Sequence, residues 1–60
     1  MNKLYIIRVY LVRGSDEILL DTITAWRFSE ILKKRRVLVK AGFSVRLVRD
    51  DAGQMVFRAV

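Results

Sequence analysis

The chain contains no proline, and its only three glycines lie at positions 14, 42 and 53. Glycine adopts the positive φ angles that tight turns and helix ends require, so each glycine is a predicted boundary between elements. Gly14 opens the turn signal Gly14-Ser15-Asp16, Gly42 suits the position that ends a helix, and Gly53 suits a hairpin turn. The three glycines therefore divide the chain into four segments.

The first segment, residues 3–13, is rich in β-branched and aromatic residues and is predicted to be a strand. Successive side chains of a strand point to opposite faces. One face is apolar or amphipathic throughout, and we place it toward the core: Tyr5, Ile7, Val9 and Leu11. The other face carries Ile6, Arg8, Tyr10 and Val12.

The second segment is predicted to hold a short strand, residues 17–21, and then a helix from about residue 25 to residue 40. Thr24 is a good N-cap residue, and Ile23 and Phe28 have the spacing of a hydrophobic staple. One side of this helix is apolar at helical spacing: Phe28, Ile31, Leu32, Leu38 and Val39. The alternative is one long helix over residues 17–40.

The last two segments, residues 43–49 and 55–60, are predicted strands joined by a turn at residues 50–53. The order is then ββαββ, a single small α+β domain over residues 1–60 with a four-stranded antiparallel sheet and the helix packed on one face. The alternative is βαββ with the longer helix. A 60-residue chain buries only ~60% of the surface of its unfolded form, so we expect marginal stability.

One helix covers only one face of such a sheet, and the other face is expected to be open. This open face is predicted to carry Ile6, Arg8, Tyr10, Val12, Ser44, Arg46, Val48, Val56, Arg58 and Val60. Three interpretations compete. In the first, a protein partner or a second copy docks on Ile6, Val48 and Val56. In the second, nucleic-acid bases stack on Tyr10 and the arginines contact phosphates. The third interpretation is a solvated face without a role.

The positive charge is concentrated in the helical segment. Twelve lysines and arginines against six acidic residues leave a formal net charge of +6, and residues 24–41 carry +5 of it. A cluster of this kind attracts a phosphate backbone without sequence specificity. The predicted nucleic-acid-binding residues are Lys33, Lys34, Arg36 and Lys40, with Arg8, Arg46, Arg58 and Tyr10 of the open face second. The alternatives are a solvated helix face and, last, a helix resting on an anionic membrane.

Two helical residues have more than one interpretation. Arg35 falls among the apolar positions, where a fully buried guanidinium is costly. Three explanations are open: the Arg35 guanidinium reaches the domain edge, it pairs with Asp21, or the helix bends after Lys34. Trp26 lies nearly opposite the apolar stripe, with Val37 on the same side, so it is either an anchor for a protein partner or a core residue at the sheet edge.

The composition argues against an enzyme. The chain has no cysteine and no histidine, which removes thiolate chemistry, a histidine-based zinc site and the usual general base. Four of its six carboxylates are two adjacent pairs in predicted turns, so we predict no metal site, no cofactor and no small-molecule substrate. The longest apolar stretch, residues 4–12, is broken by Arg8 and is far shorter than the ~20 residues of a membrane span, so a cytoplasmic protein is predicted.

The helix end and the third strand read Ala41-Gly42-Phe43-Ser44-Val45-Arg46-Leu47-Val48-Arg49. This stretch resembles the family of small early coliphage proteins that inhibit the host RNA polymerase. Arg49 matches one of the two arginines that the family has on this strand, but Leu47 stands where the other would be, and the strongly basic helix departs from the family. The resemblance implies a phage-type protein that binds a host enzyme and does no chemistry, in the host cytoplasm.

These observations predict a non-enzymatic regulator that acts on nucleic acid or on a nucleic-acid-processing machine through its basic helix. The alternative is a protein-docking inhibitor of a host enzyme, or a homodimeric interaction module, that uses the open face and Trp26. Phosphate contacts weaken steeply with salt and an apolar interface does not, so ionic strength separates the two.

Overall fold

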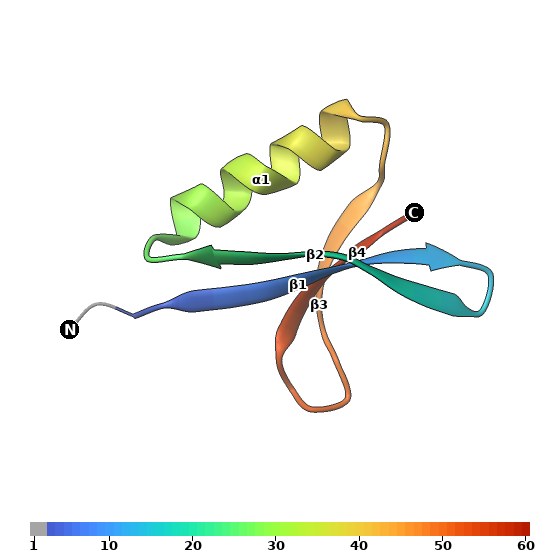
Figure 1. Cartoon of the computed structure of the whole chain (residues 1–60), viewed down its shortest axis with the longest axis horizontal. Coiled ribbons are helices and arrows are strands. Elements are labelled where there is room, and N and C mark those ends of the chain that lie inside the picture. Colours follow the sequence, from blue (N-terminus) through green and yellow to red (C-terminus); the bar gives the residue numbers. More distant parts are fainter. Residues whose placement is uncertain (1–2) are drawn as a thin grey trace.

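The computed structural model describes residues 3–60 and confirms the order ββαββ. The elements are β1 (Tyr5–Arg13), β2 (Asp16–Ala25), α1 (Phe28–Lys40), β3 (Val45–Arg49) and β4 (Met55–Ala59) (Figure 1). The four strands form one sheet with the helix on one side. The alternative of a single helix over residues 17–40 is wrong, because β2 occupies most of its first half.

The sheet has the strand order β2-β1-β4-β3 and is mixed rather than wholly antiparallel. β1 pairs with β2, and β3 with β4, in antiparallel ladders, as expected. The ladder between β1 and β4 is parallel, with Arg8 beside Val56 and Leu11 beside Ala59. The crossover through α1 brings the chain back in the direction of β2, so β3 runs parallel to β2 and the following hairpin makes β4 parallel to β1. The prediction of an all-antiparallel sheet is therefore wrong at this ladder.

β2 is longer than predicted, and this moves the start of the helix. The strand continues to Ala25, so Thr24 pairs with Ile6 of β1 and is not an N-cap. The cap position is Arg27, whose side chain makes no capping hydrogen bond. The reason is tertiary: Ile23 and Ala25 alternate with Thr24 and are both buried, which rewards continued pairing over an earlier helix.

The end of α1 follows the prediction closely. Gly42 has φ 100°, and its N–H donates to the carbonyl of Val39 at 3.0 Å. The N–H of Phe43 donates to the carbonyl of Leu38 at 3.2 Å. These two bonds are the Schellman arrangement, and Phe43 and Leu38 both pack against the core at this point.

The two hairpins also turn at their predicted glycines. Gly14 has φ 59° while Ser15 keeps a negative φ, which matches a type II′ turn of two residues between β1 and β2. Gly53 has φ 78° in the turn between β3 and β4. There the Asp50 carboxylate accepts the N–H groups of Ala52 and Gln54, at 3.0 and 2.8 Å. Short polar side chains and glycine thus determine both turns locally.

The core lies between α1 and one half of the sheet. Its buried residues are Ile7, Val9, Ile23, Ala25, Ile31, Val45, Phe57 and Ala59. Phe28 and Leu38 pack against it as predicted, and the Phe28 ring lies 5.6 Å from that of Tyr5. Leu32 and Val39 are exposed, at 44% and 45%, so their assignment to the core is wrong. Both lie on a helix flank about 80° to 100° from Ile31, where the sheet offers no neighbour.

The far half of the β1–β2 hairpin extends past the crossing with β3 and β4, where the helix does not cover it (Figure 1). Its three consecutive apolar residues Ile18, Leu19 and Leu20 are about half exposed. Leu20 has no partner on β1, because a bulge separates the pairs Val9–Asp21 and Tyr10–Leu19. The fold therefore leaves an apolar segment of an outer strand in contact with solvent.

Candidate functional site

Three predicted cations form a row on the outer side of α1, which we call the cationic stripe: Lys33, Arg36 and Lys40. Counted from the buried Ile31, they lie about 140° to 200° around the helix axis, which is the side facing away from the sheet. All three are exposed. Within residues 3–60 the structure contains one ion pair, between Arg58 and Glu17, so no carboxylate forms an ion pair with the stripe.

The stripe has a regular spacing on a rigid element. Its residues follow the order i, i+3, i+7, which separates their Cα atoms by about 4.5 and then about 6 Å along the helix axis. Lys40 also lies in the last turn, where a cation complements the helix dipole. The arrangement presents three charges in a line of about 10 Å on one surface.

Lys34 is also cationic but belongs to a different side of the helix. It lies about 60° around the helix axis from Ile31, against 140° to 200° for the stripe. Together with Lys33 it borders a shallow pocket of about 330 Å³ between α1 and the end of β2. Glu30, the only carboxylate of the helix, lines the same pocket and lies one turn before Lys34. Lys34 therefore adds to the positive field of the helix without extending the stripe.

The open face has the composition that strand alternation predicts. Leu19, Tyr10, Arg58 and Arg46 are successive partners across all four strands. The structure thus brings Tyr10, Arg46 and Arg58 into one row, and places Arg8 beside Val56 in the next. Residues Ser44 and Val60 extend the same face by exchanging two backbone hydrogen bonds.

Charge on the open face is partly cancelled. Arg58 forms its ion pair with Glu17 of β2. Tyr10 is half-buried, and the hollow of about 370 Å³ beside it is also lined by Glu17, Asp50 and Asp51. Arg49 and Arg58 line the same hollow, so its positive charge is offset by the three carboxylates, and this face is a weaker anion-binding surface than the helix.

The sheet separates the two basic surfaces. The cationic stripe lies on the helix side, whereas Arg8 and Arg46 lie on the open side, of a molecule that measures 40 × 28 × 14 Å. One extended strand or one duplex face contacts one of these surfaces at a time. The helix cations and the open-face arginines, which the sequence predicts together as nucleic-acid-binding residues, therefore do not form one site.

The predicted protein-docking residues are dispersed. Trp26 is 60% exposed in the bend between β2 and α1, which rules out its assignment to the core. Val37 is also exposed, but it lies near the other end of the helix. Ile6 is exposed and Val48 half-buried on the open face.

Val56 is buried, contrary to its prediction as an interface residue. It belongs to the central strand β4, where it lies between Arg8 of β1 and Val48 of β3. A small side chain on a central strand is shielded by longer neighbours, so membership of the open face does not make a residue accessible.

The structure shows how the Arg35 side chain is accommodated among the apolar positions of the helix. It is half-buried, and its Nη2 donates to the carbonyl of Val45 at 3.3 Å. The side chain therefore packs along the core and its head reaches the β3 edge, which was the first of the three interpretations. Residues 3–60 contain no ion pair between Arg35 and Asp21.

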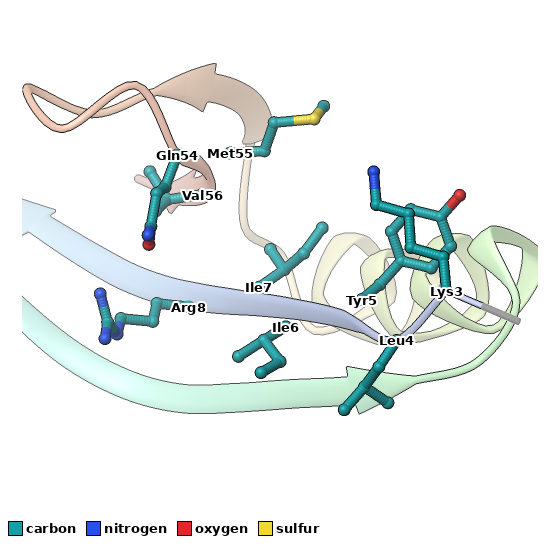
Figure 2. Close-up of a pocket in the computed structure, with 9 residues that line it drawn as sticks. All are labelled: Lys3, Leu4, Tyr5, Ile6, Ile7, Arg8, Gln54, Met55 and Val56. Carbon is teal, nitrogen blue, oxygen red and sulfur yellow. The ribbon is translucent and has the colours of Figure 1, made fainter.

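A hollow of about 420 Å³, which we call the β1 notch, was not anticipated from the sequence (Figure 2). β4 pairs with β1 only from Arg8 onward, so the start of β1 has a neighbour on one side alone. Lys3 and Arg8 lie at opposite ends of the notch, with Ile6 and Met55 between them (Figure 2). The Lys3 ammonium lies 5.5 Å from the centre of the Tyr5 ring. The notch depends on the parallel register of β4, which no local pattern signals.

The comparisons with known proteins leave the resemblance to phage polymerase inhibitors as a prediction. No family model matches the chain, and no curated protein or solved structure is significantly similar to it. Within residues 3–60 no helix is long and apolar enough to cross a membrane. The same residues contain no group of three or more carboxylates placed to hold a metal ion.

Proposed function

We propose that the chain is a small non-enzymatic protein that regulates a nucleic acid, or a nucleic-acid-processing machine, by binding phosphates through the cationic stripe Lys33, Arg36 and Lys40. The observation that supports this most strongly is that these three exposed cations have no carboxylate partner within residues 3–60. They also belong to the segment that carries most of the net charge of +6.

The cationic stripe is suited to binding the phosphate backbone of a nucleic acid rather than to reading its base sequence. Lysine and arginine on a helix surface neutralise phosphates and release counterions, which favours binding without reading bases. Because α1 is held by its Schellman cap and by core contacts of Ile31, the three charges are presented without a large ordering cost. Arg8 and Arg46 act as a separate, weaker surface on the other side.

The test is a fluorescence-anisotropy titration of labelled single-stranded and double-stranded oligonucleotides at two salt concentrations. Three phosphate contacts are expected to give a slope of log K against log salt of about −2 to −3. The triple variant Lys33→Ala/Arg36→Ala/Lys40→Ala should lose this slope almost completely. The matched control Arg8→Ala/Arg13→Ala/Arg46→Ala removes the same charge from other surfaces and should keep most of the affinity.

Two results would contradict the proposal. One is the absence of binding at the lower salt concentration, which would make the charge a solubility feature. The other is an equal loss in both triple variants, which would mean that the helix is not the contact surface. Circular dichroism of each variant checks that the fold is retained.

A protein-docking inhibitor is the second candidate, supported by the exposure of Trp26. Tryptophan on a protein surface is an effective anchor, because its large ring desolvates on binding. In that case Trp26→Ala abolishes binding to the partner, RNA polymerase being the first to test, while the oligonucleotide affinity is unchanged. Loss of neither activity in Trp26→Ala would remove this candidate.

A further inference from the structure

The two outer strands of the sheet carry opposite charges. β2 contains three carboxylates, Asp16, Glu17 and Asp21, and no basic residue. β3 contains two arginines, Arg46 and Arg49, and no carboxylate. Both are edge strands in the order β2-β1-β4-β3, so each has a row of backbone groups without a strand beside it.

The β2 edge is only partly protected against pairing. Lysine, proline and a covering element commonly block native edges, and β2 has none of these over Ile18–Leu20, where its protection is the bulge at Leu20 and the carboxylates on either side. These three residues are exposed by 49%, 53% and 44%. A strand that pairs with this edge needs apolar residues opposite Ile18–Leu20 and basic residues opposite the carboxylates on either side of them.

The hydrogen-bonding groups of β3 point outward at defined residues. Ser44 and Val60 exchange both of their backbone hydrogen bonds, at 3.1 and 2.9 Å. Alternation along an antiparallel ladder then directs the N–H and C=O of Val45, Leu47 and Arg49 away from β4. The Arg35 guanidinium already occupies the Val45 carbonyl, which leaves Leu47 and Arg49 for a new strand.

The free hydrogen-bonding groups of β2 also lie at defined residues. In a two-residue type II′ hairpin the flanking residues, here Arg13 and Asp16, form a hydrogen-bonded pair. Alternation then places the free groups of β2 on Glu17 and Leu19. In a parallel ladder, a residue forms its backbone hydrogen bonds with the two residues on either side of the residue that lies opposite it. Leu47 opposite Ile18 therefore meets the free groups of Glu17 and Leu19.

We propose that β3 of one copy of this chain adds to β2 of a second copy, in parallel, with Leu47 opposite Ile18. This register places Arg46 beside Glu17 and Val48 beside Leu19 on the open side of the sheet. Leu47 and Ile18 meet on the helix side, and Arg49 follows opposite the Leu20–Asp21 step. Because β3 runs parallel to β2 within one copy, the joined sheet keeps its helices on one side.

Symmetric pairing is disfavoured by the same charges. Two β2 edges bring carboxylates against carboxylates, and two β3 edges bring arginines together, and like charges on neighbouring strands repel. The contact is therefore heterologous, and a contact of this type continues from copy to copy unless the rotation closes a ring. The expected assembly grows beyond a dimer.

The experiment measures mass against protein concentration, by sedimentation equilibrium and light scattering, without nucleic acid, so its result is independent of the proposed function. For the wild-type chain we expect the average mass to rise past that of two copies. Glu17→Lys/Asp21→Lys makes the β2 edge basic at the two carboxylates that face Arg46 and Arg49, and Arg46→Glu/Arg49→Glu makes the β3 edge acidic. Each variant alone should associate at least ~10-fold more weakly, because attraction becomes repulsion.

Mixing the two variants is the decisive step. The basic β2 edge of one then faces the acidic β3 edge of the other, and the two unchanged edges also match, so association should return. The controls Glu30→Lys/Asp51→Lys and Arg8→Glu/Arg27→Glu change net charge by the same amounts away from both edges and should associate as the wild type does. If a double variant loses its circular dichroism signal, the single variants Arg49→Glu and Asp21→Lys, which face each other in this register, replace it.

Three outcomes would overturn the proposal. The first is a wild-type chain that stays monomeric at the highest concentration reached. The second is a closed dimer that the edge variants do not weaken. The third is an equal loss of association in edge and control variants, which would assign the association to net charge.

Discussion

The two halves of the β1–β2 hairpin contain the same kinds of residue but differ in their surroundings. In the half under α1, Ile7 and Ile23 face each other and are 2% and 5% exposed. In the projecting half, Leu11 faces Ile18, which is 49% exposed. Both halves have the β-branched and aliphatic residues of a strand. One helix therefore completes a core for half of this hairpin and leaves the apolar residues Ile18–Leu20 of the other half exposed to solvent.

The largest difference is expected between two neighbouring residues of α1. Ile31→Ala removes a side chain that is fully buried and should lower the free energy of unfolding by about 2 to 5 kcal/mol. Leu32→Ala, on the exposed flank, should cost less than about 1 kcal/mol. Urea unfolding followed by circular dichroism measures both. Equal losses would mean that the helix packs on the sheet by another side.

A smaller difference in the free energy of unfolding is expected when the same substitution is made in each half of the β1–β2 hairpin. Ile23→Val removes one methylene from the buried half and should cost about 0.5 to 1.5 kcal/mol. Ile18→Val makes the same chemical change in the projecting half and should be nearly neutral at low protein concentration. A clear loss for Ile18→Val only at high concentration would indicate that this half is covered in an assembly, as the edge pairing requires.

The smallest expected effect concerns the ion pair that joins the projecting half to β4. Glu17→Gln removes the partner of Arg58, and both side chains are 45% exposed. Exposed pairs of this kind contribute about 0 to 1 kcal/mol and are screened by salt. The loss should therefore be under about 1 kcal/mol at low ionic strength and should vanish at high ionic strength. A loss that persists at high salt would show a role beyond the ion pair.

Local chemistry was sufficient for much of the fold. The order of the elements, the helix end at Gly42 and the turn at Asp50 were predictable because each depends on residues that are close in sequence. The composition of the open face was predictable for the same reason, since alternation along a strand is local. The core residues Ile7, Ile31 and Phe57 follow from the same periodicities.

The candidate site was only partly predictable. The cations of the stripe could be named because they are exposed by default on a helix whose other side is apolar. The separation of the stripe from Arg8 and Arg46, and the neutralisation of Arg58 by Glu17, could not. The pair joins residues of β2 and β4 with β1 between them, so it exists only because of the strand order.

By itself the sequence determined the order of the strands and the helix and where they turn, because backbone conformation and alternation respond to neighbouring residues. The end of β2 at Ala25 and the exposure of Leu32 and Val39 depended on the fold. Only the tertiary structure decided that β4 lies parallel to β1, that Val56 is buried while Trp26 is exposed, and that an acidic and a basic strand form opposite edges. These features depend on which distant segments pair. Pairing is selected by the burial of the whole apolar surface at once, which no single segment encodes.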